Sequence, residues 1–299
     1  MSRTLCLLHA NCQGDMLLPL LEDTPTFARL FRVRHLVNYT HEDIDLDEMA
    51  HCSLFLYQYL SPKWKEHSSE QMLNRLSPSC TAIAIPNLFF KGYWPFWKSG
   101  GPINFADSLL EKLLEMGTPQ TALRLYLKGN PALIGDTSAL EGIVEDSLRH
   151  EEDKETRSHI CCSSLIREQW RERQLFLTIN HPGTELLFHV ADSLLRLLGL
   201  GAVPPSVRSA YSHPFDDFWL PIHPAVGQAL NLPFTAPQRR YTIFQNRLTH
   251  QEYVLAYLAC RSNNVHDFLT FLKNFVPSDT PKLTNRMPCN KAGVKGKTS

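Results

Sequence analysis

The sequence predicts an α/β fold: an open, mainly parallel sheet flanked by helices, with a helical insertion or cap and a mostly irregular and helical C-terminal part. Over the first hundred residues, short apolar runs alternate with helix-like stretches, as in a parallel sheet covered by helices. Far more residues separate successive runs than the roughly 2 to 5 that join hairpin strands. A parallel arrangement is therefore favoured.

Four segments are expected to form the strands of this sheet. Each is a short run of apolar residues bounded by polar or helix-like sequence. The expected strands are residues 3–10, 32–39, 52–60 and 81–90. A helix is expected from Asp15 onward, and Pro19 inside it predicts a bend or an early end.

The middle of the chain changes to a helical pattern. Apolar stripes at helical spacing run through residues 104–150 and predict a helical insertion or cap. A strand at 175–179, a turn at 180–183 and a helix at 185–198 then repeat the strand-turn-helix order of the N-terminus.

These segments divide the chain into four parts. The C-terminal third is rich in proline and aromatic residues before a helical pattern returns. The predicted parts are an α/β core of residues 1–100 and 160–200, a helical insertion or cap of 101–159, a Pro/aromatic-rich segment with a C-terminal helix at 201–276, and a basic flexible tail at 277–299.

Composition argues against several classes of protein. Thirty Lys and Arg balance thirty Asp and Glu, so the positive field of a dedicated nucleic-acid binder is missing. No apolar run reaches the roughly 20 residues that cross a bilayer, and the N-terminal apolar stretch is short for a signal peptide. We expect a cytoplasmic protein with no nucleic-acid partner and no membrane span. These observations are compatible with a homo-oligomer.

Known short motifs and metal sites are also disfavoured. The eight cysteines contain no CxxC pair, which argues against a disulfide framework and a zinc ribbon. Cys161 and Cys162 lie beside His159, but adjacent side chains on a helix diverge by about 100°. The P-loop, simple Rossmann, zincin and G-x-S-x-G patterns do not occur. No metal is expected.

The first strand ends in a turn that could carry chemistry. Asn11, Cys12, Gln13 and Gly14 follow it, where open α/β sheets bind ligands. A helix N-terminus predicts a lowered pKa for the Cys12 thiol, and Asn11, Gln13 and the Gly14 backbone can donate to a carbonyl oxygen or an oxyanion. Alternatively, the cysteine is a small buried residue in a turn that tolerates positive φ.

The later strand-turn-helix unit places Asn180 and His181 in the equivalent position. Two strand ends could then deliver Cys12 and His181 to one crevice, as in Cys/His chemistry assembled from distant segments. His181 would act as a general base toward a hydroxyl or a thiol. Alternatively, it is an ordinary turn or capping residue.

An aromatic-rich loop at residues 85–97 follows the fourth strand. Gly92, Tyr93 and their aromatic neighbours could form an apolar wall for a ligand, and Lys91 could meet a phosphate group. Equally, the aromatic side chains could fill the core and the lysine could be solvated.

Three blocks of this sequence resemble the WcbI family of polysaccharide biosynthesis proteins. They are LLHANCQGD from Leu7, IPNLFFKGYWP from Ile85, and LFLTINHPGTELLFHVADSLLRLLGL from Leu175. Trp94 stands where relatives commonly carry a histidine. The resemblance implies a cytosolic α/β protein that binds coenzyme A and transfers an acetyl group to a sugar hydroxyl.

The resemblance implies active-site status for Asn11, Cys12, Gln13 and His181, and the cofactor-binding candidates come from the turns and the loop described above. The expected catalytic residues are Cys12, His181, Gln13 and Asn11, and the expected cofactor-binding residues are Gly14, Asn180, Lys91, Gly92 and Tyr93. The leading hypothesis is an O-acyltransferase with coenzyme A or acetyl-CoA as co-substrate and a saccharide as acceptor. The alternatives are an esterase or thioesterase that uses the same crevice, and a non-catalytic module that binds coenzyme A or a glycan.

Overall fold

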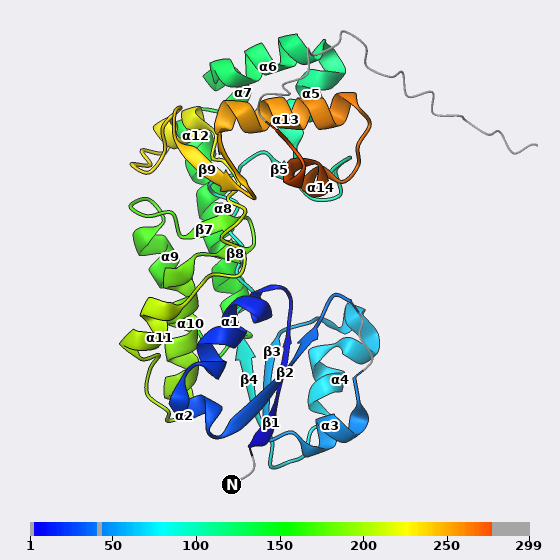
Figure 1. The fold of residues 1–299 in the computed structure, drawn as a ribbon, viewed down its shortest axis with the longest axis vertical. Helices are drawn as coiled ribbons and strands as arrows, with labels where there is room; N and C mark the ends of the chain where they lie inside the picture. The colour runs from blue at the N-terminus through cyan, green and yellow to red at the C-terminus, as the bar shows by residue number, and fades with distance from the viewer. Residues whose placement is uncertain (1–2, 41–43, 277–299) are drawn as a thin grey trace, which may run out of the picture.

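The computed structural model describes residues 3–40 and 44–276, which form two lobes joined by a narrower waist (Figure 1). The expected tail at 277–299 and Cys289 lie outside the described residues. The lower lobe in Figure 1 holds a parallel sheet, and the upper lobe is mainly helical. No helix among the described residues is long and apolar enough to cross a membrane.

The predicted parallel sheet is confirmed. Its strands are β1 (Thr4–Ala10), β2 (Phe31–Val37), β3 (Leu54–Gln58) and β4 (Thr81–Ile85), in the order β2-β1-β3-β4. All three pairings are parallel, and Cys6 of central β1 lies between Val33 of β2 and Leu54 of β3. β4 ends earlier than expected because Pro86, which has no N–H, cannot continue the ladder.

Helices cover both faces of the sheet, as a parallel sheet requires. The surrounding helices are α1 (Gln13–Glu22), α2 (Pro25–Ala28), α3 (Leu46–His51), the short 3₁₀ helix η1 (Pro62–His67) and α4 (Ser69–Leu73). Met16 and Leu20 of α1 pack with Leu8 on one face, while Met49 of α3 packs with Leu7 on the other. α1 continues through Pro19 to Glu22, so the early end expected there is wrong.

The helices expected between residues 104 and 150 are present. They are α5 (Ser108–Met116), α6 (Pro119–Lys128), α7 (Pro131–Ile134) and α8 (Thr137–Glu155). Four leucines of α5 form its buried stripe, and Gly117 ends the helix. α8 runs from the upper lobe down to the end of the parallel sheet (Figure 1), so it connects the lobes.

The second strand-turn-helix unit differs from its expected form. β7 (Phe176–Thr178) pairs antiparallel with β8 (His181–Pro182) and does not join the parallel sheet. The turn is tight because the Gly183 amide donates to the Leu175 carbonyl at 2.7 Å. α9 (Ser163–Gln169) precedes this hairpin and α10 (Thr184–Leu197) follows it.

The C-terminal part is more regular than expected. Its elements are α11 (Pro205–Ala210), α12 (Pro224–Ala229), β9 (Arg240–Ile243), β10 (Asn246–Thr249), α13 (His250–Ser262) and α14 (Phe268–Lys273), and β5 (Trp97–Lys98) pairs with β6 (Ala106–Asp107) beside them. The C-terminal helix expected within residues 201–276 is two helices, α13 and α14, because the chain turns after α13 at Asn264, whose φ is +54°. Thr249 and Glu252 form a capping box that starts α13.

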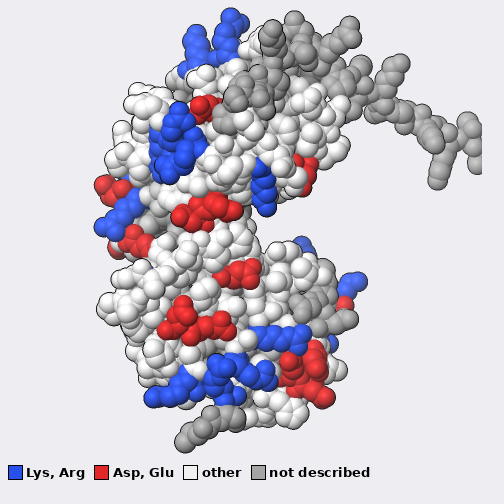
Figure 2. Space-filling view, viewed as in Figure 1, with Lys and Arg blue, Asp and Glu red and all other residues white. Residues whose placement is uncertain are grey.

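Charge is distributed without a dominant sign. On the face shown in Figure 2, basic and acidic side chains occur on both lobes, and the surface is hollowed between the lobes. The carboxyl ends of the parallel strands point toward this waist (Figure 1). Open α/β sheets bind ligands at that edge.

Candidate active site

Cys12 and His181 lie together at the carboxyl end of β1. The Cys12 Sγ is 3.5 Å from the Nε2 of His181, although 169 positions separate them in sequence. Cys12 is the N-cap residue of α1, and His181 begins β8. The expected meeting of two strand ends is therefore found, with the histidine supplied by a hairpin rather than by the main sheet.

Burial keeps this pair neutral. Desolvation, assisted by the charge of Asp15, raises the pKa of the Cys12 thiol to about 11, despite the lowering effect of the Cys12 and Gln13 backbone N–H groups. Desolvation, assisted by His213, lowers the pKa of His181 to about 4. The lowered thiol pKa expected from the helix N-terminus is therefore wrong. The site is a thiol beside an imidazole, not a thiolate beside an imidazolium.

His181 is held by packing rather than by a carboxylate. Its ring lies on Phe215 with centroids 4.6 Å apart, and its buried Nδ1 has no hydrogen-bond partner among the described residues. His213 accepts from the Phe215 amide at Nδ1, so its Nε2 carries the proton that bonds the Pro182 carbonyl. His213 therefore anchors the hairpin that carries His181.

Gln13 does not have the catalytic position expected for it. Its Nε2 donates to the carbonyls of Leu88 and Asn180, at 2.7 and 2.8 Å. Its Oε1 accepts from the Leu88 amide and from the Nε2 of Gln58. Its backbone N–H donates to the side chain of Asn11. Both amide protons are used, so buried Gln13 joins three chain segments instead of serving an oxyanion.

Asn11 and Asn180 remain as candidate side-chain donors of the site. The Asn11 Oδ1 accepts from the Gln13 amide at 2.8 Å, and its Nδ2 donates one proton to the Oδ1 of Asn87 at 3.1 Å. An amide nitrogen carries two protons, so the direction of the second is fixed as well. The Nδ2 of Asn180 lies 3.8 Å from the Cys12 Sγ. Both asparagines line the groove described below.

Gly14 supports the site through close packing against His35. Its N–H donates to the Asn11 carbonyl at 2.8 Å. A Cβ built on Gly14 would lie 2.2 Å from the Nε2 of His35, whose ring is tied to Asp15 and to the Ala10 carbonyl. The expected cofactor contact of Gly14 is therefore not supported.

Gly14→Ala is expected to lower the free energy of unfolding by about 1–3 kcal/mol, because the His35 ring must leave its partners. Gly142 in α8 is the matched control, since a Cβ there meets nothing within 4 Å. Gly142→Ala should stabilise the helix by about 0.5–1 kcal/mol. Urea unfolding of both variants measures the difference, and equal effects would refute this packing role.

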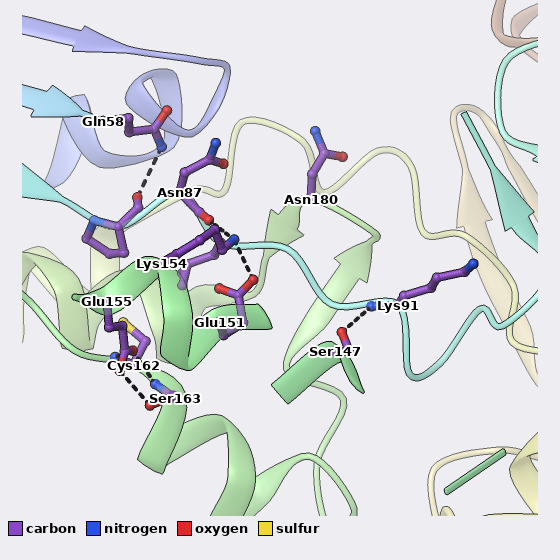
Figure 3. A network of polar contacts seen from close by, with 12 residues as sticks. Gln58, Asn87, Lys91, Ser147, Glu151, Lys154, Glu155, Cys162, Ser163 and Asn180 are labelled. Carbon is purple, nitrogen blue, oxygen red and sulfur yellow. Dashed lines mark hydrogen bonds and ion pairs between the residues drawn. The ribbon is translucent and has the colours of Figure 1, made fainter. Parts of the chain in front are cut away.

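The loop residues expected to bind a cofactor divide into two groups. Tyr93 is fully buried and its hydroxyl donates to the carbonyls of Trp170 and Arg173, while a Cβ on Gly92 would lie 2.5 Å from Phe90. Both are core residues that do not line the groove described below, and their expected cofactor contact stays a prediction. The Lys91 backbone bonds Ser147, and its side chain extends away from Asn87 (Figure 3).

A groove of about 680 Å³ is lined by Asn11 and Asn180, the chain neighbours of Cys12 and His181. Its wall combines four asparagines, three aromatic side chains and the glycine-containing loop after β5, and Lys98 and His266 are its ionisable side chains. The lining residues are Asn11, Asn87, Phe89, Trp97–Phe105, Ile179, Asn180 and His266. The groove contains planar amide groups and aromatic faces, and its lining has no carboxylate.

Comparison with known proteins assigns the family. The model described as polysaccharide biosynthesis enzyme WcbI matches residues 5–203. The chain belongs to the WcbI family. The match confirms the resemblance inferred from the three sequence blocks. The Cys12–His181 pair therefore lies in a member of a family of polysaccharide biosynthesis enzymes.

A solved structure of WcbI has the same fold. It is described as a novel polysaccharide biosynthesis enzyme, in native form without a disulfide bond between coenzyme A and a cysteine. The two chains are 19% identical, the match covers 93% of this chain and 92% of that one, and the TM-score is 0.67. None of the curated proteins matches the chain.

The described residues contain no group of three or more His, Cys, Asp or Glu that could hold a metal ion.

The sequence analysis missed two residues of the site, Gln58 and Asn87. Both stand at or just after the carboxyl ends of the strands β3 and β4. The rule that singled out Asn11 would have found them.

The buried His181 should make the stability of the protein depend on pH. Between pH 6.5 and about 4, His181 is protonated in the unfolded chain but not in the folded chain. The free energy of unfolding therefore decreases as the pH is lowered through this range, by roughly 3 kcal/mol at most. Burial raises the pKa of Asp107 to about 6 and that of Glu151 to about 7, which acts in the opposite sense.

The comparison of wild type with His181→Gln isolates this contribution, because both chains keep Asp107 and Glu151. Urea unfolding at pH 7 and at pH 4.5 is the measurement. The stability advantage of the wild type should shrink at the lower pH. An advantage that is the same at both values would contradict a neutral, buried His181.

Proposed function

We propose that this protein is a coenzyme A-dependent O-acyltransferase, with acetyl as the acyl group, that acts in the cytoplasm on a sugar hydroxyl during polysaccharide biosynthesis. The observation that carries the proposal is the neutral Cys12–His181 pair beside a groove with amide donors. The family context and the coenzyme A named for the similar WcbI structure support it.

The amides of Asn11 and Asn180 would stabilise the reacting carbonyl. Asn11 lines the groove with one N–H left over from its bond to Asn87, and the Nδ2 of Asn180 lies 3.8 Å from the Cys12 sulfur. When a nucleophile attacks a thioester, negative charge develops on the carbonyl oxygen, and fixed donors lower the barrier. Gln13 contributes by holding both segments in place.

His181 would take the proton of the nucleophile. Burial lowers the pKa of the ring to about 4, so His181 is neutral at neutral pH, and in the tautomer with the proton on Nδ1 its Nε2 accepts from the Cys12 thiol. In direct transfer, the acceptor oxygen bonds the acyl carbon, its proton moves to Nε2, and the coenzyme A sulfur leaves and takes up that proton. The products are the sugar ester and free coenzyme A.

A two-step route uses the same groups. The Cys12 sulfur bonds the acyl carbon while its proton passes to His181 and then to the departing coenzyme A sulfur. The sugar hydroxyl next attacks the acyl-cysteine, its proton passes to His181, and the Cys12 sulfur leaves and takes up that proton. The 3.5 Å contact and the high thiol pKa mean that proton transfer must accompany attack in this route.

Intact-protein mass spectrometry after mixing with acetyl-CoA tests the proposal and separates the two routes. The two-step route leaves an acetyl thioester on Cys12 of the wild type. The Cys12→Ser variant cannot form this thioester, because it has no sulfur at residue 12. Direct transfer leaves no adduct but gives an acetylated sugar in a panel of nucleotide sugars and oligosaccharides. Neither adduct nor acetylated sugar, with no binding of acetyl-CoA, would overturn the proposal.

Two further measurements, of acetate release and of thermal stabilisation by the ligand, distinguish the rival functions. Free acetate without any acceptor would indicate a thioesterase. A binding module would show ligand-induced thermal stabilisation, worth about 2.7 kcal/mol at a hundred times Kd, that survives Cys12→Ala and His181→Ala without turnover.

A further inference from the structure

Residues 86–88, here called the amide loop, are clamped by side chains from three other elements. The Nε2 of Gln58 donates to the Pro86 carbonyl at 3.1 Å. Gln13 bonds both main-chain groups of Leu88. The Nζ of Lys154, near the end of α8, donates to the Asn87 carbonyl (Figure 3). The main chain of the amide loop is therefore fixed on both sides of Asn87.

The Lys154 contact has its own support. Its Nζ lies 2.5 Å from the Oε1 of Glu151, one turn earlier in α8. The Glu151 side chain is only 3% exposed and that of Lys154 is 27% exposed, so the pair is largely shielded from solvent. Figure 3 shows Lys154 between Glu151 and the Asn87 carbonyl.

The side chain of Asn87 transmits this clamp to Asn11. Its Oδ1 accepts one proton from the Asn11 Nδ2 at 3.1 Å. The other end of the Asn11 amide is held by the Gln13 backbone N–H. With one bond at each end, the planar amide has a single orientation, and its second N–H has one direction. Asn11 and Asn87 both line the groove beside Cys12.

We propose that Asn87 is a positioning residue, which fixes the free N–H of Asn11 as a donor to the acyl oxygen, and that Lys154 holds Asn87 in place. This inference rests on the proposed acyl chemistry. Asn87 acts through Asn11, and Lys154 acts through the Asn87 main chain. Without Asn87, the Asn11 amide can swing about its remaining bond, and a misplacement of about 1 Å can cost up to 100-fold in rate.

The test compares two reactions of Cys12. Acylation by p-nitrophenyl acetate joins the sulfur to the acyl carbon and releases p-nitrophenol, and charge develops on the acyl oxygen on the way. Alkylation by iodoacetamide joins the sulfur to carbon and releases iodide with a proton, and no such charge develops. The ratio of the two rate constants at the Cys12 peptide, followed by mass spectrometry, therefore reports oxyanion stabilisation separately from thiol reactivity.

The ratio should fall about 100-fold in Asn11→Ala, which removes a donor, and about 10-fold in Asn87→Ala, which misorients it. The double variant should be no worse than Asn11→Ala alone, because Asn87 has nothing left to position. Asn74→Ala, an exposed asparagine at the end of α4, is the matched control and should leave the ratio unchanged. Multiplying effects in the double variant, or an unchanged ratio in Asn87→Ala, would overturn the proposal.

Lys154 provides a rescue pair. Lys154→Met should lower the ratio, and Lys154→Arg, which can still reach the Asn87 carbonyl, should restore most of it. Equal loss in both variants, at unchanged thermal midpoint, would overturn the role of Lys154. The probes contain neither coenzyme A nor sugar, so a wild type that fails to use acetyl-CoA but shows these ratios would refute the proposed function and leave this inference standing.

Discussion

His181→Gln should lower the rate of acyl transfer by about 10²–10⁴-fold while coenzyme A binds as before. The glutamine amide can still occupy the space over Phe215, but it cannot accept and return a proton. The rate at saturating acetyl-CoA gives the first quantity, and calorimetric titration with coenzyme A gives the second. A similar rate in the variant would remove His181 from the reaction.

His213→Gln is the control for this variant. His213 holds the Pro182 carbonyl and does not approach the Cys12 sulfur in any described contact. We expect a smaller loss of rate, because the hairpin is less firmly held but the base remains. A larger loss than in His181→Gln would indicate that His213, and not His181, is the base.

Gln13→Ala should lower the free energy of unfolding by about 2–4 kcal/mol. The substitution leaves two carbonyls, one main-chain amide and the Gln58 amide without their partner inside the protein. Gln13→Glu should also destabilise, since a carboxylate cannot donate to the Leu88 and Asn180 carbonyls. Urea unfolding at pH 7 measures both changes.

The matched control is Gln71→Ala, at an exposed position of α4. Surface substitutions of this kind stay within about 0.5 kcal/mol. If Gln13→Ala costs no more than Gln71→Ala, the clamp of Gln13 is not what assembles the site.

The parallel sheet could be predicted because its strands are buried runs separated by long connections, a pattern that local sequence displays. The hairpin that carries His181 could not. A run such as residues 175–179 is typical of a strand whichever partner it finds. Its antiparallel pairing with β8, closed by the Gly183–Leu175 hydrogen bond, is a tertiary feature that the run does not display. Cys12 and His181 still meet as expected, because the hairpin places its turn beside the carboxyl end of β1 although it does not belong to the parallel sheet.

The individual roles within the site were harder to predict. Gln13 looks like a free donor in sequence, and its partners Leu88 and Asn180 lie 75 and 167 positions away. The sign of the Cys12 pKa shift depends on burial, which comes from the packing of distant segments and outweighs the helix N-terminus. Local sequence shows the N-terminus but not the burial.

The reaction of the cysteines with coenzyme A disulfide tests the central claim most directly. Thiol exchange joins the Cys12 sulfur to one coenzyme A sulfur and releases the other as a thiol. Cys161 is exposed, whereas Cys12 is partly buried with a pKa near 11, so an unbound disulfide such as hydroxyethyl disulfide should modify Cys161 first. If the groove seats coenzyme A beside Cys12, coenzyme A disulfide should reverse that order, and acetyl-CoA should protect Cys12. Modification of Cys161 first with both reagents, without protection by acetyl-CoA, would contradict the account.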